Sequence, residues 1–231
     1  DCALIMNFGG GGFGDAAVVP GPWEKNPRGI RRLDDWYEAH LLHPQYIHDL
    51  FGMQAEIALA NLEVLRQALG DRVAVINISG SDFGSQSGEI ISPAMYRSLY
   101  KPYHKALNDW VHGHTPWKTH FHCCGSIVHL LDEFVDAGVD VLNPVQVSAA
   151  GMDAGTLKER YGATLVFWGG GVDTQKTLPF GTPREVRDEV RRRIETFAPG
   201  GGFVFSSIHN IQAMTPIENL LAMFDAVAEY R

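Results

Sequence analysis

One short segment of this sequence gathers side chains that could bind a metal. Residues Lys118–Ser126, KTHFHCCGS, include the end of a β-rich run. Strand alternation places His120, His122 and Cys124 on one face and turns Cys123 toward the covering helices. A neutral imidazole and a thiolate are good zinc ligands, and a catalytic zinc needs one more ligand and an open position. The segment predicts His122 and Cys124 as ligands, although a core thiol beside a hydrogen-bonded histidine fits the same residues.

The third ligand must come from the end of another strand. The segment Ser206–Asn210 offers His209, which is also a candidate general acid. A structural histidine bonded to a loop carbonyl is the alternative for His209. The remaining histidines lie in helical or polar stretches and are expected at the surface: His40, His43, His48, His104, His112, His114 and His129.

Other strand ends carry polar side chains that could hold a substrate. The candidates are Asp82, Asn143, Gln146, Asp173 and Gln175. Asp82 emerges between glycines that would let a ligand approach the backbone, and it is also a candidate catalytic residue. A turn-forming aspartate explains Asp82 equally well, and a tight turn explains the glycines at 169–171. No Gly-Lys-Ser/Thr phosphate loop is present.

The elements that must position these residues alternate along the chain. Six β-rich runs, most of them followed by a polar loop and an amphipathic stretch, predict repeated βα units around a parallel sheet. The runs are Ala3–Phe8, Val73–Ser79, Trp117–Cys123, Val139–Val145, Thr164–Trp168 and Phe203–Ile208. The glycines at 9–12 lead into prolines and not into a helix, which disfavours a doubly wound dinucleotide fold. The pattern favours a TIM (β/α)8 barrel, whose active site lies at the carboxyl ends of the strands.

The sequence predicts where several helices begin. Three hydroxyl side chains precede a proline at an expected first helical position, in Ser92-Pro93, Thr182-Pro183 and Thr215-Pro216. Glu185 and Glu218 follow two of these hydroxyls by three residues, which predicts two capping boxes. Predicted amphipathic helices cover Ile127–Ala137, Pro183–Phe197 and Pro216–Tyr230. Interleaved charges on the second of these predict a solvated face and not an anion-binding patch.

The chain is short for a complete barrel. It has 231 residues, starts with Asp1-Cys2 and runs almost directly into a β-rich segment, whereas a complete (β/α)8 barrel usually needs about 250 residues or more. We expect one domain over residues 1–231, the C-terminal two-thirds of a barrel, with about six of eight βα units and about two N-terminal units missing. An exposed sheet edge should mark the missing units.

Charge and composition exclude several classes of protein. The formal net charge of −8 disfavours nucleic acid as the main partner. Apolar runs stop well short of the roughly 18 residues of a membrane span, and no signal segment opens the chain. Three cysteines, two of them adjacent, do not form a disulfide framework. These features predict a cytoplasmic protein with no membrane partner.

Taken together, three segments resemble the uroporphyrinogen decarboxylase superfamily. They are Phe121–Ser126, Gly171–Asp173, and the stretch from His209-Asn210-Ile211 to Thr215–Asn219. The resemblance covers essentially the whole chain and implies a (β/α)8 barrel. It also implies two chemistries, because some members decarboxylate a tetrapyrrole without a cofactor and others are zinc-dependent methylcobamide:thiol methyltransferases.

The H-x-C-G element is similar to that of the methyltransferases. There, the resemblance implies, the His and Cys of H-x-C ligate zinc with a second Cys before the final helix. His122 and Cys124 match, but His209 stands at the third position, where the decarboxylases also have a histidine. The resemblance thus favours a zinc-dependent methyltransferase that acts between a corrinoid and a thiol, with methylcobalamin or a corrinoid protein as the implied methyl carrier. The alternatives are a uroporphyrinogen decarboxylase and a non-catalytic corrinoid- or tetrapyrrole-binding protein.

Overall fold

The computed structural model describes residues 2–9, 11–14, 25–26, 30 and 32–230. Within them, six strands form one sheet whose order follows the chain, which confirms the predicted parallel α/β fold. The strands are β1 (Ile5–Asn7), β2 (Val75–Ser79), β3 (Lys118–His122), β4 (Val141–Asn143), β5 (Val166–Trp168) and β6 (Phe203–Val204). Each strand lies within one predicted run but is shorter, so Cys123 and Cys124 follow the end of β3. No helix of the described residues combines the length and the apolar character needed to cross a bilayer.

The chain divides into two compact units. Unit 1 comprises Asp1–Phe83, Glu89–Cys123 and His129–Asp140, and unit 2 comprises Gly84–Gly88, Cys124–Val128 and Val141–Arg231. The expectation of a single domain over residues 1–231 stays a prediction.

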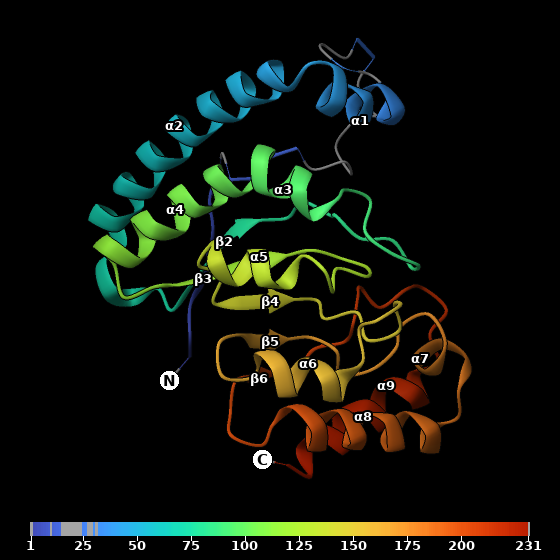
Figure 1. Ribbon diagram of the computed structural model, residues 1–231. Helices are drawn as coiled ribbons and strands as arrows, with labels where there is room; N and C mark the ends of the chain where they lie inside the picture. The colour runs from blue at the N-terminus through green and yellow to red at the C-terminus, as the bar shows by residue number, and fades with distance from the viewer. Residues whose placement is uncertain (1, 10, 15–24, 27–29, 31, 231) are drawn as a thin grey trace. The chain divides into compact units, whose positions relative to one another are not determined.

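Unit 1 holds β1 to β3 and the helices of the first half of the chain. The helices are α1 (Leu33–Leu42), α2 (Pro44–Leu69), α3 (Pro93–Leu99), α4 (Lys101–His114) and α5 (Leu131–Asp136), with a short 3-10 helix, η2 (Gly70–Arg72). The strands β1, β2 and β3 pair in parallel. Helix α4 packs on β2 and β3, and α2 lies alongside α4 (Figure 1). Ser92 caps α3 by accepting a hydrogen bond from Met95 N–H, which confirms one predicted helix start.

The core of unit 1 is an aromatic cluster that includes two histidines. His104 of α4 is fully buried, and its ring packs edge-on against Phe121 of β3 with 4.7 Å between centroids. His40 of α1 is 3% exposed and makes a short contact with the hydroxyl of Tyr100. The expectation that both histidines lie at the surface is therefore wrong. Each sits on the apolar face of its helix, where aromatic neighbours enclose the neutral ring.

The buried imidazole of His104 predicts acid lability. Burial lowers the pKa of His104 from 6.5 to about 3. As the pH falls, the imidazole of His104 is protonated in the unfolded chain before it is protonated in the folded protein. The contribution of His104 to the free energy of unfolding is therefore complete above pH 6.5 and is lost as the pH falls below that value. Between pH 7 and pH 5 we expect this group to remove about 2 kcal/mol of the free energy of unfolding.

Urea unfolding of the unsubstituted protein and His104→Phe at the two pH values measures this loss. Burial also lowers the pKa values of His40 and His120, so these two histidines add to the loss of stability at low pH in both proteins. The difference between the two proteins therefore isolates the contribution of His104. Equal pH dependence in both proteins would contradict the assignment.

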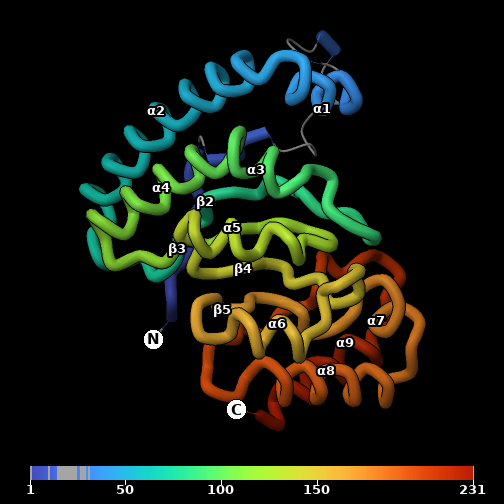
Figure 2. The backbone as a smooth tube through the Cα atoms, viewed as in Figure 1, coloured from blue at the N-terminus to red at the C-terminus, as the bar shows by residue number. Residues whose placement is uncertain are grey.

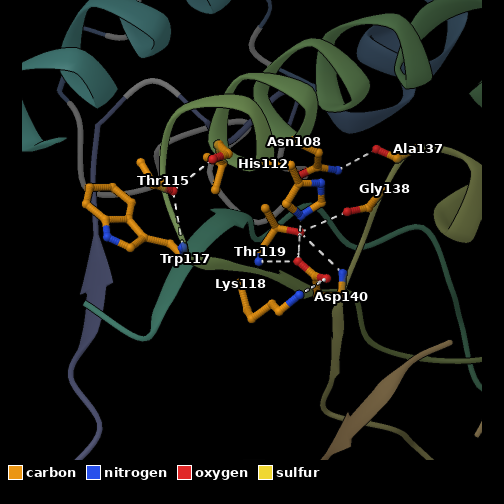
Figure 3. A network of polar contacts seen from close by, with 10 residues as sticks. Asn108, His112, Thr115, Trp117, Lys118, Thr119, Ala137, Gly138 and Asp140 are labelled. Carbon is orange, nitrogen blue, oxygen red and sulfur yellow. Dashed lines mark hydrogen bonds and ion pairs between the residues drawn. The ribbon is translucent and has the colours of Figure 1, made fainter. Parts of the chain in front are cut away.

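A polar network secures the amino end of β3 (Figure 3). The Asp140 carboxylate accepts a hydrogen bond from Thr119 N–H at 2.8 Å, and His112 Nε2 lies 2.7 Å from the same oxygen. Lys118 Nζ lies 3.3 Å from the other oxygen. Burial raises the pKa of Asp140, but the Thr119 and His112 contacts outweigh it and leave the pKa below its usual value. In parallel barrels this end of the strands is the one that serves stability and not catalysis.

Unit 2 holds β4 to β6 and four helices. These are α6 (Ala154–Tyr161), α7 (Thr177–Phe180), α8 (Pro183–Phe197) and α9 (Ile217–Ala228). Helices α8 and α9 pack together (Figure 2). In the sequence, β6 lies between them. Their shared core is Val172, Leu178, Val186, Val190, Ile194, Ala222, Met223 and Ala226. On the outside, Arg187 pairs with Asp225 at 2.6 Å and Arg191 with Glu229 at 2.7 Å.

One of the two predicted capping boxes forms. Thr182 Oγ1 accepts from Glu185 N–H, and the Glu185 carboxylate accepts from Thr182 N–H at 2.7 Å. The box at Thr215 is wrong, because Pro216 keeps an extended ψ of 133° and α9 begins at Ile217. The Thr215 hydroxyl instead donates to the carbonyl of Gln212 at 2.9 Å.

Candidate metal centre

The ends of β2 and β3 bring an aspartate and a histidine together. Asp82 follows β2 by three residues, and His122 is the last residue of β3. The Asp82 carboxylate oxygen lies 3.8 Å from His122 Nε2, and each side chain is about one-third exposed, at 35% and 33%. β2 and β3 are paired neighbours, so the loop after β2 emerges beside the last residue of β3. Both side chains are reachable from solvent.

Cys124 completes a group of three possible ligands. One ligand atom each from Asp82, His122 and Cys124 lies within 4.8 Å of the other two, and among the described residues no other group meets this criterion. Carboxylate oxygen, imidazole nitrogen and thiolate sulfur are the protein ligands that zinc takes. The donor set therefore fits zinc, with three protein ligands.

Two glycines allow the backbone around Cys124 to pack closely. A Cβ atom on Gly84 would lie 2.5 Å from the carbonyl oxygen of Cys124, and one on Gly125 would lie 2.4 Å from the backbone carbon of Gly84. Gly125 also has a φ of +87°, which side chains of L-residues rarely allow. Its N–H donates to the buried Gln146 side chain at 2.9 Å. These contacts hold the backbone immediately after Cys124 in one conformation.

Cys123 faces the opposite way from its neighbour. Its side chain is 1% exposed, and its sulfur accepts a hydrogen bond from Phe83 N–H at 3.2 Å. Phe121, two residues earlier on the same face, packs against Phe134 of α5 with ring centroids 4.8 Å apart. The alternation of β3 continues into the two residues after it, so that Cys123 is a core thiol and Cys124 is partly exposed.

A second histidine lies on the same face of β3 as His122. Nδ1 of His120 is 3.0 Å from the side-chain amide of Asn77 on β2. Burial, and to a lesser extent the charge of His122, lowers the pKa of His120 from 6.5 to about 4. His120 is therefore neutral at physiological pH and adds no positive charge below the candidate centre.

His209 lies in unit 2, in the loop after β6. Its side chain is exposed, and with Thr174, Gln175, Asn210 and Gln212 it lines a small cavity of about 240 Å³. All five lining residues have polar side chains. The role of His209 as third zinc ligand or as general acid stays a prediction.

The other predicted substrate contacts make bonds within unit 2. Asn143 donates to the carbonyl of Trp168 at 2.9 Å. Asp173 is buried, and its carboxylate accepts from the N–H of Gln175 at 2.6 Å. The Gln175 side chain accepts from Gln86 at 3.2 Å. Together with Gln146, these groups fix the loops that follow β4 and β5, and their contact with a substrate stays a prediction.

Sequence reasoning assigned Asp82 to substrate binding and catalysis and did not consider it as a ligand. A signal was available, because Asp82 follows the strand that precedes β3 in the chain. In a parallel sheet built in chain order, the loops after consecutive strands are neighbours.

The comparisons with known proteins agree with the fold. A family model described as "Uroporphyrinogen decarboxylase (URO-D)" matches residues 25–230. Among solved structures, a methyltransferase from Methanosarcina mazei is similar with a TM-score of 0.69 and 19% sequence identity. The similarity covers 100% of this chain, which spans 59% of the length of that methyltransferase. No match was found among curated protein sequences. The family match extends over most of the sequence, and this chain belongs to the uroporphyrinogen decarboxylase family.

Proposed function

We propose that this protein is a zinc-dependent methyltransferase that moves a methyl group between a corrinoid and a thiol. The observation that carries the proposal is the group Asp82, His122 and Cys124, whose ligand atoms lie within 4.8 Å of one another. Asp82 is taken as the third ligand because of its 3.8 Å approach to His122. A tetrahedral ion with three protein ligands keeps one position for a substrate atom. The fold similarity to a methyltransferase is a second support.

Asp82, His122 and Cys124 would each have a role that follows from the chemistry of its side chain. Zinc held here would supply a Lewis acid that lowers the pKa of a substrate thiol, so that the thiol is a thiolate at neutral pH. His122 must be neutral and Cys124 deprotonated to serve as ligands, so metal affinity should fall as the pH drops. The Asp82 carboxylate would offset part of the positive charge. The thiolate sulfur forms a bond to the methyl carbon, and the methyl–cobalt bond breaks with its electron pair remaining on cobalt.

A cofactor-free decarboxylase is the second candidate, and the family match favours it. Its substrate, a tetrapyrrole with up to eight carboxylates, calls for basic side chains at the carboxyl ends of the strands. In the segments 80–92, 123–130, 144–153, 169–176 and 205–216, which follow β2 to β6, Lys176 is the one lysine and there is no arginine. Asp82 and Asp173 in the same segments would repel carboxylates. Within these five segments the charge distribution favours the methyltransferase, whereas the segment 8–32, which follows β1, carries Lys25, Arg28, Arg31 and Arg32.

One preparation can separate the two functions. The protein is incubated with methylcobalamin and a small thiol, and in parallel with uroporphyrinogen. We expect methylation of the thiol and no carbon dioxide release. Carbon dioxide release from uroporphyrinogen without any methyl transfer would reverse the assignment.

A further inference from the structure

Asp82 lies between two residues whose side chains belong to the core of unit 1. Ser81 is fully buried and Phe83 is 2% exposed, whereas the side chain of Asp82 is 35% exposed. Buried and accessible side chains thus alternate over these three residues. Because its two neighbours occupy the core, the Asp82 side chain lies on the accessible side, where its carboxylate is 3.8 Å from His122 Nε2.

The hydroxyl of Ser81 makes a buried hydrogen bond to a distant segment of the chain. Ser81 Oγ donates to the backbone carbonyl of Phe13, which lies beyond the end of β1. The N–H of Ser81 donates to the side chain of Ser79 at 3.3 Å. A serine hydroxyl has a single proton to donate, and a buried donor without an acceptor is costly. The bond to Phe13 therefore disfavours other conformations of Ser81 and of the backbone beside it.

The carbonyl of Phe13 is itself held in place by packing. The Phe13 side chain is fully buried, and its ring centroid lies 5.4 Å from that of His104 and 5.5 Å from that of Phe51. The backbone just before it is packed against β2, because a Cβ atom on Gly11 would lie 2.2 Å from the carbonyl oxygen of Ile78. The acceptor of the Ser81 hydroxyl is thus fixed relative to the end of β2.

The residue on the other side of Asp82 is held by its ring. Phe83 packs edge-on against Tyr100 with 4.8 Å between ring centroids, and its carbonyl accepts a hydrogen bond from Ile90 N–H at 2.7 Å. Packing therefore fixes one neighbour of Asp82, and the hydroxyl of Ser81 fixes the other. The hydroxyl can be removed by a single substitution that deletes only one atom from the core.

We propose that Ser81 is a positioning residue of the candidate zinc centre, where it holds the Asp82 carboxylate in the direction of His122 that a shared ion requires. The proposal rests on the proposed function, since it takes Asp82 as a zinc ligand. Ser81 acts through Asp82 and not on the ion, because its own hydroxyl is buried against the Phe13 carbonyl. Loss of a group that orients a metal ligand costs about 10- to 100-fold in metal affinity.

A double-mutant cycle of zinc affinity tests this role. Competition with a chromophoric chelator gives the affinity of the unsubstituted protein, Ser81→Ala, Asp82→Ala and the double variant. We expect Ser81→Ala to lower the affinity about tenfold or more, and to have no further effect once Asp82→Ala has removed the ligand. An equal loss in both backgrounds would show a general structural effect and would overturn the proposal. Unchanged affinity in Ser81→Ala would also overturn it.

Cobalt in place of zinc provides a spectroscopic measurement of the same effect. In Ser81→Ala the thiolate-to-cobalt charge-transfer band should persist, because Cys124 still binds the ion. The d–d bands should shift toward those of Asp82→Ala. A spectrum identical to that of the unsubstituted protein would contradict the role of Ser81.

A matched control separates positioning from a loss of stability. Ser92→Ala removes another serine hydroxyl of unit 1, which accepts a hydrogen bond from Met95 N–H at 3.1 Å at the start of α3. It should lower the urea midpoint without changing the zinc affinity. If Ser81→Ala does not fold, Phe13→Leu, which loosens the packing of the acceptor, takes its place in the cycle. Zinc affinity should then fall only while Asp82 is present, and any other result would overturn the proposal.

Failure of this proposal can be distinguished from failure of the proposed function. An unsubstituted protein that binds no zinc would overturn both. A protein that binds zinc with an affinity indifferent to Ser81→Ala would overturn the positioning role alone and leave the proposed methyltransferase standing.

Discussion

Cys124→Ala should remove bound zinc from this protein, whereas Cys123→Ala should retain it. The two thiols are adjacent in sequence but lie in different environments. Cys124 belongs to the group whose ligand atoms lie within 4.8 Å, and Cys123 is 1% exposed with its sulfur bonded to Phe83 N–H. Loss of a supporting hydrogen bond near a zinc site already costs about 10- to 100-fold in affinity. Loss of a thiolate ligand should cost more than about a hundredfold.

The measurement is zinc content by elemental analysis after dialysis, followed by competition with a chromophoric chelator. Cys123→Ala serves as the matched control for removal of one thiol, and it should lower the free energy of unfolding by about 1 to 3 kcal/mol because Phe83 N–H loses its acceptor. Zinc retained at full affinity in Cys124→Ala, or lost only in Cys123→Ala, would contradict the assignment of the centre.

The fold could be predicted because its signals are local and repeat along the chain. Each βα unit shows a short apolar run, a polar loop and an amphipathic helix, and chirality then limits how consecutive units can be arranged. The two faces of β3 followed from alternation alone, since strand side chains have a period of exactly two residues. Its buried Phe121 and accessible His122 lie on the faces expected.

The composition of the candidate centre was only partly predictable. His122 and Cys124 are two residues apart, so their proximity is a local property of the chain. Asp82 lies 40 residues before His122, and its approach depends on strand register and on loop conformations that no local pattern specifies. The burial of His104 did have a signal, because it shares a helical face with Leu107 and Val111, but the polar side chain masked it.

Removal of zinc should separate the proposed methyltransferase from its decarboxylase alternative. In the proposed reaction the thiol needs a Lewis acid to become a thiolate at neutral pH, so chelation should reduce methyl transfer from methylcobalamin to the background rate. Zinc added back should restore the rate in the unsubstituted protein and in Cys123→Ala, but not in Cys124→Ala. Circular dichroism of the chelated protein controls for unfolding.

For a decarboxylase, the opposite response to zinc removal is expected. That reaction uses neither a metal nor a thiolate, so chelation should leave carbon dioxide release unchanged, and activity would depend on His209 as an acid or an electrostatic contact. His209 is exposed and lines a cavity of about 240 Å³ in unit 2 together with Thr174, Gln175, Asn210 and Gln212. We expect no carbon dioxide release before or after chelation. Release from uroporphyrinogen that persists without zinc and disappears in His209→Ala would assign the reaction to this cavity and leave Asp82, His122 and Cys124 without a catalytic part.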